Sequence, residues 1–296
     1  MSVPSTPQTV LITGASSGIG RATAMELAGR GARLVLVARG RDALEETAAE
    51  VRAAGAAAAV VCPADVVDED AITAAVEAAL ERFGRLDAVV HAAQVMAYGT
   101  IEEVPRRVFE TVVETAVHGT AVVARVVLPV FRRQGGGRLV VVNSLLGQIA
   151  TPLLGSYIAA KWGQLGLVRV LQQETRDVPG ISISILQPGG VDTPIYVQAA
   201  SWAGSTGRPP PPVYSPERLG RRIVALLDRP RRQVQAGLFN PLITAAFRLV
   251  PGVFDVLVGP MIQRLAIAND DVPPTEGNVF ASQPDRNAID GRWRSI

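Results

Sequence analysis

Thr13-Gly14-Ala15-Ser16-Ser17-Gly18-Ile19-Gly20 follows an apolar run at residues 9–13 and precedes an alanine-rich amphipathic segment. Glycines spaced G-x-x-x-G-x-G allow a tight turn between a strand and a helix, and they let backbone amides approach a pyrophosphate near the positive end of the helix dipole. The spacing differs from the common G-x-G-x-x-G, and a Gly/Ser-rich turn without a ligand is the alternative. The stretch predicts a βα unit whose candidate nucleotide-binding residues are Gly14, Ser16, Ser17, Gly18, Ile19 and Gly20.

Short β-branched runs alternate with longer amphipathic segments from residue 9 to about residue 187. Continuously apolar runs such as Leu34-Val-Leu-Val-Ala are typical of strands that helices cover on both faces. We therefore expect an α/β fold, a doubly wound (Rossmann) parallel sheet with helices on both faces. The predicted strands are residues 9–13, 33–38, 58–62, 88–91, 138–143, 181–187 and 232–236, and the predicted helices include residues 69–83, 106–134, 156–178 and 215–227.

The length of 296 residues predicts one catalytic domain, residues 8–240, followed by a C-terminal extension, residues 241–296. Residues 190–214 are rich in Gly, Ser and Pro and are expected to form a substrate loop. Residues 238–267 are apolar, but charged residues and prolines interrupt them, which argues against a transmembrane helix. The extension is expected to be helical and then irregular, and to pack on the domain, on a partner subunit or on a membrane surface.

Charge and cysteine content exclude several classes of protein. The net charge is +2, and the arginines are scattered, so no nucleic-acid partner is expected. Cys62 is the only cysteine, which rules out an intrachain disulfide and suits a reducing compartment. The first residues lack the features of a secretory signal, so we expect a cytoplasmic protein. With only His91 and His118 and no acidic cluster, no metal site is expected.

Tyr157-Ile158-Ala159-Ala160-Lys161 contains the only lysine of the chain, whose other 28 basic residues are arginines. Residues four apart lie on one face of a helix, so the spacing brings an ammonium beside a phenol. A nearby cation favours the phenolate and lowers the pKa of the tyrosine, which makes Tyr157 a candidate proton donor or acceptor. An ordinary surface contact is the alternative interpretation.

Arg39 stands at the end of the second predicted strand, where an acidic residue would bind the ribose 2′-hydroxyl of NAD. Arginine suits a 2′-phosphate, so NADP(H) is favoured over NAD(H). The alternative is that Arg39 and Arg41 are solvated residues at the start of a helix.

The turn at residues 13–20, followed in order by Ser144, Tyr157 and Lys161, resembles the classical short-chain dehydrogenases/reductases. The resemblance covers about residues 8–195 and includes the thirteen-residue spacing from serine to tyrosine. It implies a doubly wound sheet that binds NAD(H) or NADP(H), and hydride transfer between the nicotinamide and an alcohol or carbonyl carbon.

The resemblance also assigns a role to each residue. Tyr157 would be the catalytic acid/base, Ser144 would hydrogen-bond the reacting oxygen, and Lys161 would hold the nicotinamide ribose and lower the pKa of the tyrosine. Reduction of a carbonyl builds negative charge on its oxygen, and a neutral donor with a transferable proton stabilises that charge. By the same resemblance, the other expected cofactor contacts are Asp65, Val66, Ala92, Ala93, Pro188, Gly189, Val191 and Thr193.

Two positions depart from the family pattern. The family's Asn-Asn-Ala-Gly after the fourth strand reads His91-Ala92-Ala93-Gln94, which places a long side chain where glycine leaves room near the cofactor. The family's helix asparagine corresponds to Ala116. In family members the backbone carbonyl at that position holds a water that relays protons to the lysine, so the resemblance implies a backbone relay through Ala116.

The expected function is that of an NADP(H)-dependent oxidoreductase acting on a secondary alcohol or ketone. The alternatives are a degenerate family member that binds a nucleotide or a partner with little turnover, and a dehydratase or epimerase on the same scaffold. The resemblance implies a homodimer or homotetramer formed through two long helices. A nonpolar substrate is suggested by the apolar residues Leu153, Ile195, Tyr196, Val197 and Trp202.

Overall fold

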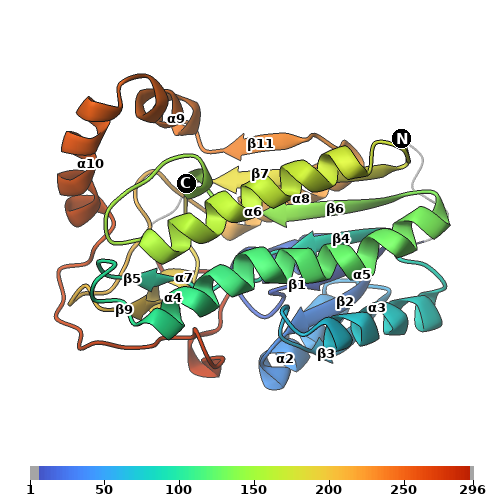
Figure 1. Cartoon of the computed structure of the whole chain (residues 1–296). Helices are drawn as coiled ribbons and strands as arrows, with labels where there is room; N and C mark the ends of the chain where they lie inside the picture. Colours follow the sequence, from blue (N-terminus) through green and yellow to red (C-terminus); the bar gives the residue numbers. More distant parts are fainter. Residues whose placement is uncertain (1–6, 294–296) are drawn as a thin grey trace.

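The structure is a computed structural model that describes residues 7–293. Seven parallel strands form one central sheet in the order β11-β7-β6-β4-β1-β2-β3, which confirms the predicted fold class (Figure 1). Continuous apolar sequence explains their burial, because helices cover both faces of the sheet. The strands are β1 (Thr9–Thr13), β2 (Arg33–Ala38), β3 (Ala58–Pro63), β4 (Ala88–His91), β6 (Gly137–Val142), β7 (Ile181–Pro188) and β11 (Gln233–Ala236).

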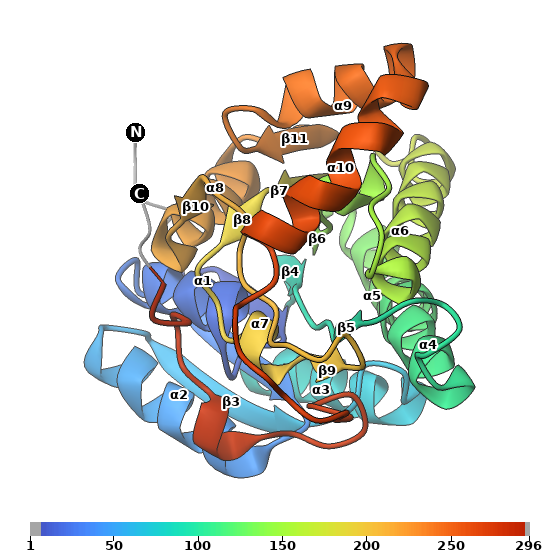
Figure 2. The same ribbon diagram turned by 90° about the vertical axis from the view of Figure 1, so that its left-hand side faces the viewer.

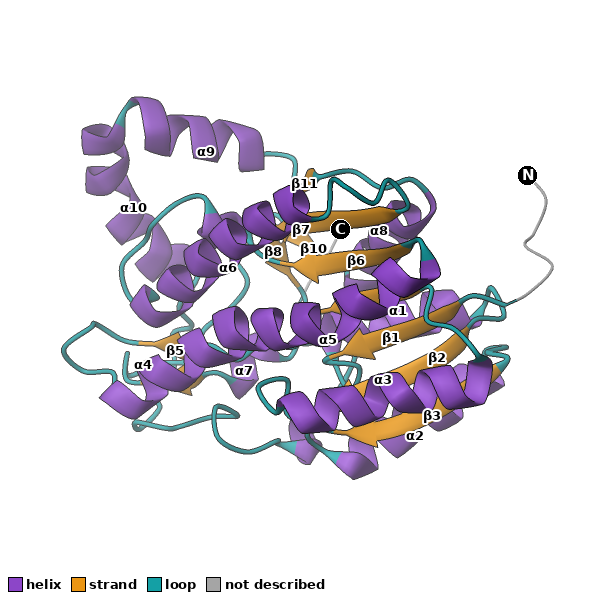
Figure 3. Cartoon of the chain, turned by 45° about the vertical axis from the view of Figure 1, so that its right-hand side comes forward, coloured by secondary structure: helices purple, strands orange, loops and turns teal. Residues whose placement is uncertain are grey.

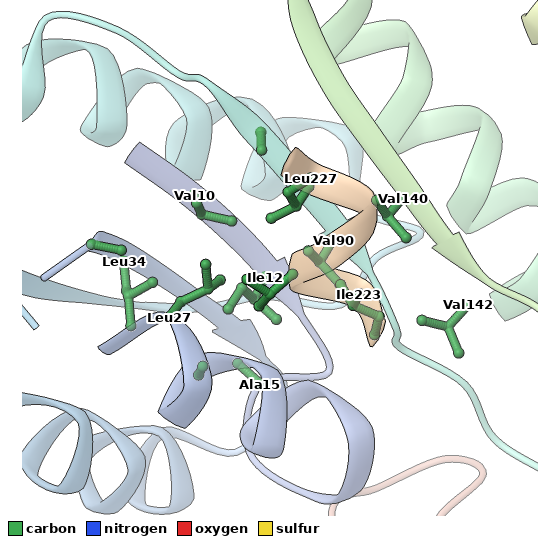
Figure 4. Packing of buried hydrophobic residues seen from close by; sticks show 14 of the residues in the cluster. Val10, Ile12, Ala15, Leu27, Leu34, Val90, Val140, Val142, Ile223 and Leu227 are labelled. Carbon is green, nitrogen blue, oxygen red and sulfur yellow. The ribbon is translucent and has the colours of Figure 1, made fainter. Parts of the chain in front are cut away.

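Helices pack on both faces of the sheet and enclose two apolar cores (Figure 3). One face carries α1 (Gly18–Ala28), α2 (Arg41–Ala53) and α8 (Pro216–Asp228), and the other carries α3 (Glu69–Phe83), α5 (Gly119–Gln134) and α6 (Gly155–Glu174). Figure 4 shows the first core, where side chains of β1, β4 and β6 meet those of α1 and α8. Each large aliphatic side chain buried there contributes about 1.5–3 kcal/mol. The labelled residues include Val10, Ile12, Leu27, Val90, Val140, Ile223 and Leu227.

The strand order reverses between β1 and β4, which are paired in parallel. The chain runs outward from β1 through β2 to β3, and then outward from β4 through β6 and β7 to β11. Crevices at such a reversal lie outside the carboxyl ends of the strands and bind ligands in open α/β sheets. The remaining short strands are β5 (Ala97–Tyr98), β8 (Gly190–Val191), β9 (Ala200–Ser201) and β10 (Val213–Tyr214), and the short helix α7 spans Ile195–Gln198.

The helix predicted at residues 106–134 has the expected extent, but it is not uniform. It consists of α4 (Arg106–Val113), a π-helical turn (Glu114–His118) and α5. It is long and apolar enough to pass a length-and-composition test for a membrane span, but half of its most apolar window is buried in the domain, as in a core helix. The helix predicted at residues 156–178 ends earlier, at Glu174, since Pro179 disfavours helical backbone at the preceding residue.

Beyond β11 the chain forms α9 (Asn240–Leu249) and α10 (Pro251–Leu265), which stand above the carboxyl ends of the strands (Figures 1 and 2). An edge-to-face contact between Trp162 of α6 and Phe247 of α9, with ring centroids 6.1 Å apart, attaches α9 to the domain. A second such contact, 5.2 Å between Phe247 and Phe254, joins α9 to α10. After α10 the chain returns past α7 toward the ends of β2 and β3 (Figure 2). We call residues 266–293 the tail.

Candidate active site

The glycine-rich turn packs tightly against the end of β4. Gly14 has φ +68°, and a Cβ there would lie 2.8 Å from the backbone nitrogen of Ala93. A Cβ on Gly20 would lie 2.1 Å from the carbonyl oxygen of Gly14. Only glycine therefore fits at these two positions of the turn that leads into α1, a helix whose N-terminal amides can bind an anion.

A cleft with a cavity volume of about 160 Å³ runs along this turn. Most of the predicted cofactor residues line it, although they come from five different strand ends. The volume is below the roughly 300–1,000 Å³ typical of ligand pockets, because the tail closes one side. The predicted residues that line it are Gly14, Ser16, Ser17, Gly18, Ile19, Gly20, Arg39, Asp65, Val66, Ala92, Ala93 and Thr193.

Ser144, Tyr157 and Lys161 lie together in a second, adjoining cavity of about 450 Å³, which Pro188, Gly189 and Val191 also line. Ser144 lies two residues beyond the end of β6, and its Oγ accepts a hydrogen bond from the Leu146 backbone N–H at 3.1 Å. Tyr157 and Lys161 lie one turn apart on α6, with Nζ 5.5 Å from the centroid of the phenol ring. All three side chains are buried.

The expectation that Lys161 lowers the pKa of Tyr157 is wrong for the protein alone. Burial raises the pKa of Tyr157 to about 12, against a lowering by the hydrogen bond with Ser144. Burial lowers the pKa of Lys161 to about 7. The reason is desolvation, which disfavours the charged form of each group. Tyr157 is therefore a neutral proton donor near neutral pH.

The Ala116 carbonyl, for which the resemblance implies a role in a proton relay, has side-chain partners in the structure. Ala116 lies in the π-helical turn, and its carbonyl accepts hydrogen bonds from Thr120 Oγ1 at 2.6 Å and from Gln164 Nε2 at 3.4 Å. Gln164 Oε1 accepts a hydrogen bond from Lys161 Nζ at 3.2 Å. A carboxamide thus occupies the space between the carbonyl and the lysine, because residue 164 is glutamine. The sequence analysis missed Gln164, although a polar residue on the buried face of α6 was visible.

His91 and Gln94, the first and last residues of the segment that departs from the family pattern, have different surroundings. His91 is buried, its Nδ1 lies 2.9 Å from Thr13 Oγ1, and burial lowers its pKa to about 3. It is therefore a neutral histidine that packs at the end of the strand. Gln94 lines both cavities, and its Nε2 donates to the Val95 carbonyl at 2.8 Å. His118 is exposed. Among residues 7–293, no group of three or more His, Cys, Asp and Glu side chains could hold a metal.

The walls of the second cavity come largely from helices that the sequence analysis did not assign to the site. Leu242, Val253 and Leu257 of α9 and α10 line it, and each of these side chains is more than half exposed. Ile195 and Tyr196 line the cavity as expected. The cavity is not lined by Val197, Trp202 or Leu153, so its apolar character comes largely from residues that were not predicted. The interrupted apolar pattern at residues 238–267 was the available signal.

The tail covers Arg39, which the sequence analysis did not anticipate. Arg39 Nη1 donates to the Val279 carbonyl at 2.8 Å, and Nη2 donates to the Asn278 carbonyl at 2.5 Å. Burial lowers the pKa of Arg39, while Asp65 opposes the change. The Gly18 N–H, at the start of α1, donates to the Ala288 carbonyl at 2.9 Å. Tail carbonyls thus occupy the hydrogen-bond donors of two residues that line the cleft, Arg39 and Gly18.

Comparison with known proteins places the chain in a family. The family model for short chain dehydrogenases matches residues 8–204. An uncharacterized oxidoreductase of Bacillus subtilis, YxnA, is 31% identical over 300 residues, which cover 97% of this chain and 83% of that protein. Levodione reductase of Leifsonia aquatica is 37% identical over 192 residues, which cover 64% of this chain and 72% of that enzyme.

Solved structures agree with this result. The alcohol dehydrogenase of the archaeon Thermococcus sibiricus, complexed with 5-hydroxy-NADP, matches with a TM-score of 0.68 and 28% identity. The match covers 78% of this chain and 96% of that one. The sheet and the glycine-rich turn of this chain therefore belong to a scaffold on which nicotinamide cofactors bind.

Proposed function

Because this chain belongs to the short-chain dehydrogenase family of NAD(P)-dependent oxidoreductases, we propose that it interconverts an apolar ketone and its secondary alcohol with NADP(H). One observation carries the proposal. Ser144, Tyr157 and Lys161 line an apolar cavity that adjoins the glycine-rich cleft, with Gln94 at the boundary of the two. Hydride donor and carbonyl acceptor would meet at that boundary.

The residues of the cleft fit a dinucleotide. Gly14 and Gly20 let the turn pack closely against the backbone at residues 92–93 and against itself, and the N-terminus of α1 suits a pyrophosphate once the Ala288 carbonyl releases the Gly18 N–H. Asp65 and Val66 would contact the adenosine, and Lys161 would hold the nicotinamide ribose. When bound, the cofactor supplies or accepts the hydride.

The protein's own residues manage the proton. In the reductive direction, Ser144 Oγ donates a hydrogen bond to the carbonyl oxygen, and Tyr157 transfers its phenolic proton to that oxygen as negative charge develops. The raised pKa of Tyr157, about 12, keeps this proton available at neutral pH. In the reverse direction Tyr157 must first lose its proton, and the resulting phenolate then accepts the proton of the alcohol.

The preference for NADP(H) rests on Arg39, whose guanidinium suits a 2′-phosphate. The tail carbonyls of Asn278 and Val279 hold this guanidinium. Binding of the phosphate therefore requires that the tail yield these two hydrogen bonds. We include this exchange in the proposal, since an acid that would favour NAD(H) is absent after β2.

The substrate is proposed to be apolar, because the cavity wall formed by α9 and α10 consists mostly of aliphatic side chains. The cavity volume, about 450 Å³, lies within the range of ligand pockets. The outer side of these helices exposes further large apolar residues, including Leu249 (79% exposed) and Val256 (73%). Contact with a second subunit or with a lipid surface would cover them. A cytoplasmic homo-oligomer is the proposed form, consistent with the single free Cys62.

The proposal is tested by titrating the protein with NADPH and NADH and then measuring nicotinamide absorbance with a panel of ketones of increasing chain length. We expect tighter binding of NADPH and turnover that rises with apolar length. Binding without turnover of any ketone would favour the degenerate alternative. Light scattering with and without lipid vesicles reports what covers α9 and α10.

A further inference from the structure

Lys161 contacts a buried polar cluster, formed by Asn143, Gln164 and Thr120, that its catalytic role does not explain. Its side chain is buried, and Nζ donates to the Val142 carbonyl at 3.1 Å and to Gln164 Oε1 at 3.2 Å. Among the described residues no carboxylate forms an ion pair with it. Its ammonium therefore depends on neutral acceptors, and within residues 7–293 Gln164 is the only side chain among them.

Gln164 is fully buried, and both ends of its carboxamide are used. Oε1 accepts from Lys161 Nζ and from Asn143 Nδ2 at 2.9 Å, and Nε2 donates to Thr120 Oγ1 at 3.0 Å and to the Ala116 carbonyl. Because Thr120 gives its own proton to Ala116, its Oγ1 must accept from Gln164. A flipped amide would point Nε2 at two donors. The contacts thus fix the amide orientation.

We propose that Gln164 is a positioning residue that holds the Lys161 ammonium toward the cavity and closes the proton path between Lys161 and the Ala116 carbonyl. A carboxamide carries a proton across only by converting to its unstable imidic acid form, whereas a water in this place would pass protons. Lys161 therefore exchanges its proton on the cavity side, past Tyr157. The effect on turnover rests on the proposed function, but the effect on Lys161 itself does not.

The other titratable groups around Lys161 leave Gln164 as the main polar determinant of its charge. Tyr157 on the same helix and His91 at the end of β4 are both neutral at pH 7, since burial raises the pKa of Tyr157 and lowers the pKa of His91. Tyr98 and Tyr196 line the same cavity and also have raised pKa values. Removal of the Gln164 acceptor should destabilise the ammonium with no nearby charge to compensate.

The test uses the fact that Lys161 is the only lysine. The full chain, without a lysine in any tag, is labelled with ¹³C-lysine, and the Cε resonance is followed by NMR from pH 5 to pH 11. The wild type should titrate near pH 7. Gln164→Leu should titrate about one pH unit lower, because a hydrogen bond to a charged group is lost, and Gln164→Glu should titrate higher, because a carboxylate favours the ammonium.

Gln172→Leu is the matched control, since Gln172 is a buried glutamine of the same helix that bonds to the Ile183 and Arg232 carbonyls and not to Lys161. It should leave the Lys161 titration unchanged. An unchanged titration in Gln164→Leu, or shifts of the same sign in the leucine and glutamate variants, would overturn the proposal. If Gln164→Leu does not fold, the direction of the shift in Gln164→Glu decides. The NMR result is independent of turnover, so it stands even if no ketone is reduced.

Discussion

The preference for NADPH over NADH should depend on the tail, and Gly277→Ala perturbs the tail at one atom. Gly277 has φ +54°, and a Cβ there would lie 2.3 Å from the Gln198 carbonyl oxygen and 2.5 Å from the Ala200 nitrogen. Both are backbone atoms that cannot move aside easily, so the tail must shift. The next two residues, Asn278 and Val279, supply the carbonyls that hold Arg39.

The size of the effect follows from the hydrogen bonds to Arg39. A hydrogen bond to a charged group contributes about 1.5–3 kcal/mol, and the 2′-phosphate must replace two of them. If the substitution already breaks one of these hydrogen bonds, that bond no longer opposes the binding of NADPH. The affinity for NADPH then rises about tenfold, since 1.4 kcal/mol is a factor of ten. NADH has a 2′-hydroxyl and needs Arg39 less, so its Kd should change little.

Fluorescence titration gives both Kd values for the wild type, for Gly277→Ala and for a control, Gly84→Ala. Gly84 also has a positive φ, +77°, but a Cβ there would meet nothing within 4 Å. The control should keep the wild-type ratio of the two Kd values. A folded Gly277→Ala protein with that same ratio would refute the idea that the tail competes with the 2′-phosphate.

Three further predictions concern stability, substrate and catalysis. The pKa of His91 is about 3 in the folded protein and about 6.5 in an unfolded chain, so the unfolded state binds more protons between these two pH values. The stability that this residue contributes is therefore complete above about pH 6.5 and is lost as the pH falls toward 3. In urea titrations, His91→Asn should weaken the pH dependence in this window by up to about 1.4 kcal/mol per pH unit, and an unchanged slope would contradict a buried neutral histidine. Each methylene added to an apolar ketone should raise kcat/KM about fourfold, because its burial contributes about 0.8 kcal/mol. Leu257→Gln should reduce this increase in kcat/KM with chain length. A wild-type kcat/KM that does not change with chain length would exclude the cavity as the substrate site. Ser144→Ala should lower kcat about 10²–10³-fold with an unchanged Kd for NADPH, as measured by stopped-flow absorbance, and a wild-type kcat would remove Ser144 from the mechanism.

The fold could be predicted from the sequence because its signals are local. Apolar β-branched runs, the glycine-rich turn and the Ser215-Pro216 helix start each determine their own segment, and the seven sheet strands lie within two residues of the predicted bounds. The π-helical turn at Glu114–His118 could not be predicted in this way. It depends on tertiary packing around Ala116, which the helical periodicity of the segment does not show.

The candidate site shows the same division. Ser144, Tyr157 and Lys161 follow from order and spacing on neighbouring elements, and the structure brings them together. The pKa values of Tyr157 and Lys161 could not be judged, because the spacing gives their proximity but not their burial. The tail over Arg39 is a contact between residues about 240 positions apart, for which the sequence holds no periodic signal.

The proposed function depends on the buried phenol of Tyr157 as the proton source for reduction of a carbonyl in the apolar cavity. Single-turnover oxidation of bound NADPH by an apolar ketone, compared between the wild type and Tyr157→Phe, tests this most directly. We expect the rate of Tyr157→Phe to be about 10²–10⁴-fold lower, with the Kd for NADPH within about twofold of the wild type, because only the transferable proton is removed. A phenylalanine variant that reduces the ketone at the wild-type rate would contradict it.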